Sequence, residues 1–414
     1  MAGQYELRKF LRQVSNKILK EYFERIGWDP RVEWAKLSET SVQPIFDAFQ
    51  NAPEDIRARL NDEFGQINEM ATEGGIRTIM DEGRWRGLDL GTALQGVGGL
   101  HDQVLRVLLD YPAKDGRVSL FDVARRFQKS DSIAERSWRK RSGVPEIQHA
   151  KTRDDEVAKK LEEGRKRLEE ALSSYYKVKE GRGHHCVVEH FERGDSLYWF
   201  AYPEDYQEAR IEYVGDKLGR RVSSPPFEII FRHSNAKRML EIHGKADSAT
   251  VEELRTLWAR AVLGTDDLGT PPERGVEYEL NVLKTKRQFP FRLTDGVREV
   301  RVSALRLSYI GDRKNRRITL EANTRKDPNA VFDLMDELLS TGKLSLDIVN
   351  ITQAVMNFVF AADTRTGTKA VPARITYPDS CSLKHEPKEE IAREYLREWK
   401  IDVTQGAQPD SQGT

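Results

Sequence analysis

The chain has 414 residues, with 67 Lys and Arg balanced by 67 Asp and Glu. A mean hydropathy of −0.65 argues against a membrane-embedded protein, and charge neutrality excludes a polycationic or polyanionic chain. At roughly 100–200 residues per domain, the length suits two or three domains. Two cysteines are too few for a disulfide framework. The first residues lack the basic and apolar segments of a secretory leader, so we expect a cytoplasmic protein without a membrane partner.

Residues 1–130 are predicted to form an all-helical domain. Apolar side chains recur at helical spacing through residues 5–26, and Asp29-Pro30 should end this helix because proline disfavours helical geometry in the residue before it. The glycine-rich stretch 83–99 is predicted as a loop or lid. Further helices are expected near 41–50, 54–71, 100–110 and 119–127.

Two segments of different character follow this domain. Residues 131–150 lack periodicity and are predicted as a basic linker. Residues 151–178 carry one apolar seam among many charged residues, which predicts a connecting helix. A coiled-coil contact with a partner would need the same pattern, so that alternative stays open.

Residues 179–401 are predicted to form an α+β domain, because short runs rich in Val, Ile, Tyr, Phe and Trp replace the helical periodicity. The fold class is therefore α+β: an all-α N-terminal domain followed by an α+β domain of repeated antiparallel β-hairpin–helix units. Strands are expected at 186–191, 196–202, 210–214, 227–231, 239–242, 277–283, 297–309, 318–321, 354–360 and 374–377, and helices at 250–263, from 328, and at 388–399.

The order of these elements suggests an internal duplication of about 184–264 and 277–343, with a third unit at 351–400. In this alignment Phe231 falls on Tyr309 and Ile242 on Leu320. A chance recurrence of a common unit is the alternative. The polar tail 402–414 is expected to be disordered.

A histidine-rich segment offers the first chemical hypothesis. If residues 184–190 form a strand, its twofold periodicity places His184, Cys186 and His190 on one face. Zinc favours Cys and His ligands, and His233 or His243 could complete such a site. A metal-dependent hydrolase or nuclease would follow, with zinc as its cofactor. The alternatives are an activated Cys186 thiol, for which a base must come from another strand, and ordinary side chains on a half-exposed sheet.

Local charge offers the second hypothesis. Between Asn281 and Lys326 there are 13 Lys or Arg against four Asp or Glu, in a chain that is neutral overall. Cations there flank Phe289 and Phe291, and others crowd a predicted hairpin tip at 311–317. Such surfaces suit a polyphosphate backbone, with exposed rings available for base stacking. The candidate contacts are Lys284, Lys286, Arg287, Arg313, Lys314, Arg316 and Arg317, joined by Arg136, Arg139, Lys140 and Arg141 of the linker.

The sequence therefore favours a binding or adaptor protein that associates with DNA or RNA through a basic β-hairpin surface. The metal-dependent enzyme is one alternative, and a scaffold subunit with a protein partner is the other. The basic side chains could equally meet acidic segments of the chain or simply solvate a sheet. The residues that would carry out catalysis are unknown, since no motif specifies a reaction.

Overall fold

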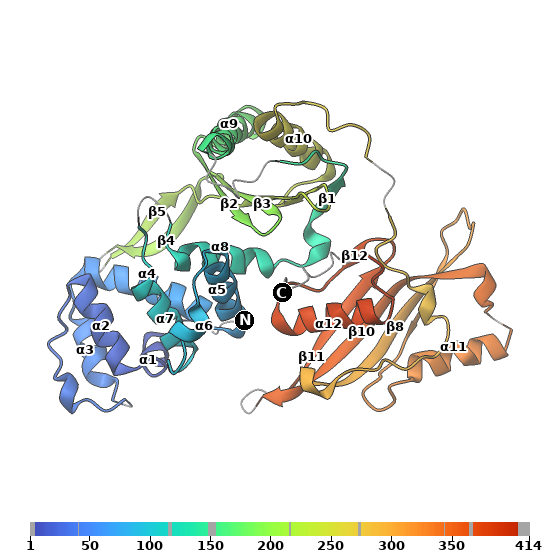
Figure 1. Ribbon diagram of the computed structural model, residues 1–414, viewed down its shortest axis with the longest axis horizontal. Helices are drawn as coiled ribbons and strands as arrows, with labels where there is room; N and C mark the ends of the chain where they lie inside the picture. The colour runs from blue at the N-terminus through green and yellow to red at the C-terminus, as the bar shows by residue number, and fades with distance from the viewer. Residues whose placement is uncertain are drawn as a thin grey trace, which may run out of the picture. The chain divides into compact units, whose positions relative to one another are not determined.

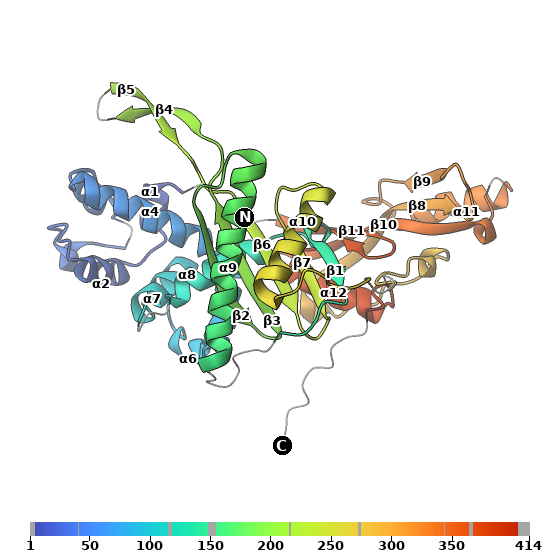
Figure 2. The same ribbon diagram turned by 90° about the horizontal axis from the view of Figure 1, so that it is seen from above.

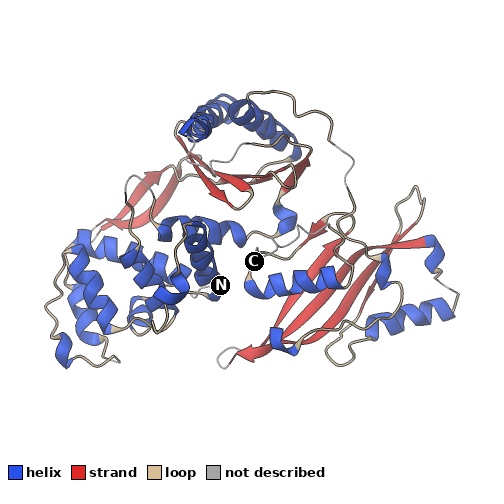
Figure 3. Cartoon of the chain, in the orientation of Figure 1, coloured by secondary structure: helices blue, strands red, loops and turns tan. Residues whose placement is uncertain are grey.

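The computed structural model describes residues 5–39, 41–114, 118–147, 155–214, 217–271, 275–342, 344–363 and 367–404. The chain divides into two compact units, residues 1–133 with 384–390, and residues 134–383 with 391–414. A helical region is followed by a sheet-rich region, so the predicted α+β class is confirmed (Figures 1 and 3). None of the helices in the described ranges has the length and apolarity that a bilayer crossing requires. Most of the tail expected to be disordered, 405–414, lies outside these ranges.

Helices build the first unit around an aromatic core. Phe64 is fully buried and stacks on Phe10, with 4.4 Å between ring centroids, and Tyr22 and Phe23 lie close by. The predicted positions of most helices are confirmed. The helices are α1 (Leu7–Leu11), α2 (Asn16–Ile26), α3 (Gln43–Gln50), α4 (Glu54–Met70), α5 (Glu73–Trp85), α6 (Leu90–Ala93), α7 (Leu100–Asp110) and α8 (Leu120–Asp131).

Two predictions for this unit are wrong. The single helix expected over 5–26 is broken before α2, where the backbone N–H of Ser15 donates to the Asp102 carboxylate at 2.8 Å. Helix α5 extends into the stretch expected to be a loop. Its glycines permit close packing: a Cβ atom at Gly75 would lie 2.1 Å from the Met70 carbonyl oxygen, and one at Gly83 would collide with Leu90.

The second unit contains two antiparallel five-stranded sheets. The first sheet has the strand order β1-β7-β6-β3-β2, and α9 (Asp155–Glu180) and α10 (Ser248–Trp258) pack on one of its faces (Figure 1). Strands β4 and β5 form a separate two-stranded ribbon. The strands are β1 (Arg139–Ser142), β2 (Cys186–Arg193), β3 (Ser196–Pro203), β4 (Glu208–Val214), β5 (Lys217–Ser223), β6 (Ile229–Ser234) and β7 (Met239–His243).

The segments expected to be a linker and a connecting helix are both part of the structure around the first sheet: the linker contributes an edge strand, and the helix covers one face. Within the 131–150 segment, Arg139 pairs with Ile242, so β1 is an edge strand next to β7. Helix α9 buries Leu168 and Leu172 in the core that it shares with the sheet, because its apolar seam has the helical spacing needed to cover β2 and β3. Residues 148–150 of the expected linker lie outside the described ranges.

The second sheet has the order β12-β11-β10-β8-β9, with α11 and α12 contributing to the core on one of its faces. Its elements are β8 (Val297–Tyr309), β9 (Arg317–Glu321), α11 (Ala330–Ser340), β10 (Val349–Asp363), β11 (Gly367–Thr376), β12 (Ser380–Cys381) and α12 (Pro387–Glu398). The strand expected at 277–283 is absent from this described segment. Tyr278, Leu280 and Leu283 instead enter the core from an irregular segment that ends in a 3₁₀ turn.

A hairpin followed by a helix does recur along the second unit, as β6-β7-α10, β8-β9-α11 and β10-β11-α12. The strand register does not follow the proposed alignment, however. Phe231 is opposite Ile242 in the first hairpin, whereas the residue opposite Leu320 in the second is Leu305, not Tyr309. The internal duplication stays a prediction.

Candidate nucleic-acid interface

The hairpin that joins β8 to β9 presents cations at its tip, which we define as residues 311–317. The strands pair through Leu305 opposite Leu320 and end with Ser308 opposite Arg317. The turn therefore lies where the sequence predicts it. Four exposed basic side chains line it, Arg313, Lys314, Arg316 and Arg317.

Arg316 is fixed within the tip and its neighbours are not. Its Nε lies 3.0 Å from the Asp312 carboxylate, and the hydrogen bond between these side chains helps to lower the pKa of Asp312. Within the described residues, no hydrogen bond or ion pair engages the side-chain cations of Arg313, Lys314 and Arg317. Three of the four predicted cations are thus available to an anion.

The tip continues onto the outward face of the second sheet. Cross-strand pairing places Arg306 beside Gln353 and Gln353 beside Thr376, while inward neighbours such as Leu305 and Met356 enter the core. Four neighbouring cross-strand rows of the face each carry one arginine, but Arg301 is paired with Glu299 at 2.6 Å and Glu321 shares the row of Arg374. The outward side chains include Arg301, Arg306, Arg317, Arg374, Gln353, Asn357, Thr376 and Ser308.

Hydrogen bonds across the strands hold these polar groups in place. Arg306 donates to the Gln353 side-chain oxygen at 2.7 Å, and the Gln353 amide donates to the Thr376 hydroxyl at 2.8 Å. Asn357 donates to the Ser303 hydroxyl at 2.8 Å. The result is a fixed polar surface of amide, hydroxyl and guanidinium groups, the kinds of donor that proteins use on phosphates and sugars.

The other predicted basic residues of this unit do not join that face. The Lys284 ammonium donates to the Leu346 carbonyl at 2.8 Å, and Lys286 pairs with Asp333 of α11 at 3.0 Å. Arg287 lies over the Phe289 ring. These three cations are engaged by the chain itself, so the structure does not group them with the hairpin tip.

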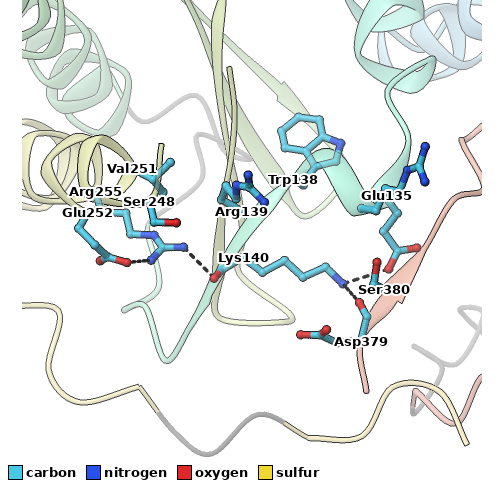
Figure 4. A pocket seen from close by; sticks show the side chains of 11 residues that line it. Glu135, Trp138, Arg139, Lys140, Ser248, Val251, Glu252, Arg255, Asp379 and Ser380 are labelled. Atoms are coloured by element: carbon cyan, nitrogen blue, oxygen red, sulfur yellow. Dashed lines mark hydrogen bonds and ion pairs between the residues drawn. The ribbon is translucent and has the colours of Figure 1, made fainter. Parts of the chain in front are cut away.

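The basic run of the expected linker, residues 136–141, enters strand β1 at Arg139, and several of its side chains line a cavity. A cavity of about 340 Å³ is lined by Arg136, Arg139 and Lys140 together with the α10 residues Ser248 and Arg255, among others (Figure 4). In the described part of the chain the guanidinium groups of Arg136 and Arg139 make no hydrogen bond or ion pair. Arg141 donates to backbone carbonyls of Leu268 and Gly269. This run belongs to the first sheet, whereas the hairpin tip belongs to the second.

Lys140 is an internal residue, which corrects its prediction as a nucleic-acid contact. Its ammonium lies 3.0 Å from Glu135 and 2.8 Å from Glu277, and Glu135 also accepts from Arg393 of α12 at 2.5 Å. We call Glu135, Lys140, Glu277 and Arg393 the charge cluster. Two carboxylates and two cations balance there, because burial without pairing would be costly.

The pKa values in the charge cluster follow from burial and pairing. Burial raises the pKa of Glu135, but Lys140 and Arg393 outweigh it, so the pKa lies below its ordinary value. Burial lowers the pKa of Lys140, but the two carboxylates raise it further, to a value above the ordinary one. For Glu277 burial prevails and its pKa is raised. The ammonium of Lys140 and the carboxylate of Glu135 therefore stay charged.

Phe289 and Phe291, which were expected to stack on bases, are half-buried against the core of the second unit. Phe289 contacts the Trp399 ring at 5.0 Å between centroids, and Phe291 packs against the same core. Trp138 is buried beside His243. Their apolar surface is used for packing, so base stacking by these rings is not supported.

Only residues 186–190 of the histidine-rich segment lie in β2, because His184 and His185 occupy a bend before the strand, and the side chains do not converge on one point. Cys186 packs against the core beneath α9, His184 is exposed and His190 lies 3.8 Å from Glu162. The two histidines expected to complete a metal site bind backbone carbonyls instead: His233 contacts Pro145 and His243 contacts Ser137. Among the described residues, no group of three or more His, Cys, Asp or Glu is placed to hold a metal ion.

Both thiols should be unreactive in the folded protein, which tests the activated-cysteine hypothesis. Burial raises the pKa of Cys186 to about 12 and that of Cys381 to about 11, so the nucleophilic thiolate is scarce at neutral pH. We expect slow reaction with a thiol-specific chromogenic reagent until denaturant exposes two thiols per chain. A Val178→Cys variant provides a fast control because Val178 is 84% exposed. Rapid reaction of a native thiol would contradict the expectation.

Comparison with known proteins does not assign the chain to a family. No family model, no curated protein and no solved structure matches the chain.

Proposed function

We propose that the protein binds nucleic acid through the sugar–phosphate backbone, using the hairpin tip and the outward face of the second sheet. The observation that carries the proposal is the group of three cations, Arg313, Lys314 and Arg317, whose charged groups make no hydrogen bond or ion pair within the described residues. They are continuous with the fixed polar face that holds Arg306. Unpaired cations beside amides and hydroxyls match the contacts that proteins make with phosphates.

A duplex suits this surface better than an unpaired single strand. Single-strand binding commonly relies on rings that stack on successive bases. Phe289 and Phe291 are half-buried against a core of the second unit and Trp138 is buried, whereas the outward face offers hydrogen-bond donors and charge. Shape and backbone contacts of this kind give affinity with little sequence preference.

Neutralising the hairpin tip should weaken binding. In the variant Arg313→Gln, Lys314→Gln, Arg317→Gln we expect the affinity for a short DNA or RNA duplex to fall about tenfold or more at low salt. Each lost phosphate contact lowers the slope of log affinity against log salt by about 0.9, so the slope should fall by about 2 to 3. Fluorescence anisotropy across a salt series measures both quantities.

A matched control removes the same charge elsewhere. Lys159, Lys160 and Lys166 are exposed on α9, and replacing all three with glutamine also removes three positive charges. We expect near-normal affinity and slope from this control. Equal effects of the two triple variants would mean that binding depends on the net charge of the protein and not on the position of these cations. Unchanged affinity in the tip variant would remove these residues from the site and favour a protein partner.

A further inference from the structure

Strands β4 and β5, which we call the arm, extend the β3–β6 pair beyond the first sheet (Figure 2). The isolated bridge between Glu204 and Pro226 links the two ribbons. The arm is a sheet of two strands only, and such a ribbon is marginally stable by itself in water. An additional strand would complete it.

One face of the arm is largely apolar and open to solvent, with Arg220 opposite Ile211 as its one charged residue among the described residues. Ile211, Tyr213, Leu218 and Val222 are 74%, 75%, 63% and 54% exposed. Tyr213 is opposite Leu218, and Val222 is opposite Ala209, so cross-strand pairing gathers these side chains on one face. Exposed apolar side chains gathered on one face in this way are typical of an interaction surface.

The two edges of the arm differ in charge. Strand β5 carries Lys217, Arg220 and Arg221 and no acidic residue, so a second copy of β5 would be repelled. Strand β4 alternates Glu208, Arg210 and Glu212. An alternating edge can match its own copy, which makes β4 the edge suited to self-pairing.

Only one antiparallel register pairs the whole of β4 with itself. Ile211 is the central residue of the seven-residue strand, and an axis there sets Arg210 opposite Glu212 of the second copy, twice. An axis at Arg210 would oppose two arginines, and an axis at Glu212 would oppose two glutamates. The present partners of these residues, Glu208 and Arg221, lie in exposed ion pairs that are readily exchanged.

We infer that two copies of the chain associate through β4, antiparallel and centred on Ile211, to form a four-stranded ribbon. The contact is isologous, with the same edge used by both copies. Ile211 meets its own counterpart, and Tyr213 lies beside Ala209 of the second copy. The charge pattern fixes the register, and the shared apolar face strengthens the pairing.

Charge exchange tests this register in the full-length chain by sedimentation equilibrium. Arg210→Glu and Glu212→Arg should each raise the dimer dissociation constant about tenfold or more, because each sets like charges opposite one another. The double variant should restore wild-type affinity, and an equimolar mixture of the two single variants should form heterodimers. A monomeric wild-type chain, or a double variant no better than the singles, overturns the proposal.

A second pair of variants separates edge pairing from stacking of the apolar faces. Ile211→Asp sets two carboxylates at the axis and should abolish the dimer. Leu218→Asp alters the same face on β5, away from the paired edge, and should leave association within about threefold of wild type. Equal loss in both variants would overturn edge pairing. Circular dichroism confirms that each variant is folded.

Discussion

Replacing Glu135 with glutamine should lower the free energy of unfolding by about 3–5 kcal/mol, because the change leaves two cations of the charge cluster sharing one carboxylate. Glu135 accepts from both Lys140 and Arg393, and the Tyr278 hydroxyl lies 3.2 Å from it. Glu135 lies in the turn before β1, Lys140 lies in β1 and Arg393 lies in α12, so the variant weakens contacts across the second unit. Urea unfolding followed by circular dichroism measures the change.

Glu398→Gln is the matched control for this variant. Glu398 forms an ion pair of 2.7 Å with Arg292, but both side chains are about half exposed, and solvent screens such a pair. A much smaller loss of stability is expected. Equal losses in the two variants would mean that burial adds nothing to the cluster.

The same cluster makes stability depend on pH with a definite sign. The pKa of Glu135 is lowered in the folded state, so its ionised form stabilises the protein above about pH 4.5 and this contribution is lost as the pH falls below that value. Glu277 has a raised pKa and acts in the opposite sense. Glu135→Gln should therefore flatten the acid limb of the stability profile relative to wild type.

Local pattern was sufficient to predict much of the fold. The helices at 43–50 and 100–110 follow apolar spacing that only a helix can place on one face, and β8 follows from its β-branched alternation. Helix α5 was not predicted because glycine lowers helix propensity. Only the packed structure shows that Gly75 and Gly83 are needed where the helix lies against Met70 and Leu90.

The candidate interface could be predicted only in part. The hairpin tip was visible as a turn with clustered cations, since both signals are local. Arg374 and Arg306 lie on one face because β11, β10 and β8 are neighbours in the sheet. The periodicity of the sequence does not reveal this strand order. Lys140 resembled its basic neighbours, but its partners Glu277 and Arg393 are distant in sequence, and burial reversed its role.

Strand β5 was not predicted because its local sequence does not have a strand pattern. Gly219 and three cations interrupt its β-branched character, so no local signal marks it as a strand. Its pairing with β4 aligns Leu218 with Tyr213 and thereby creates the apolar face of the arm. The register, rather than composition, produces this surface.

Replacing Phe64 with alanine should destabilise the first unit alone, by about 3–5 kcal/mol. Phe64 is fully buried and contacts Phe10, Tyr22 and Phe23, so its loss opens a cavity where α1, α2 and α4 meet. No residue of this core cluster belongs to the cores of the second unit among the described residues. In differential scanning calorimetry we expect two transitions, one of which moves down by on the order of 10 °C.

Trp258→Ala supplies the reciprocal variant, because Trp258 is fully buried in the second unit against Trp199, 5.4 Å away between ring centroids. It should shift the other transition and leave the first in place. If both variants shift a single transition together, the two compact units unfold as one cooperative structure and are not independently stable. If each variant shifts its own transition, the helical unit is stable independently of the sheets that carry the candidate interface.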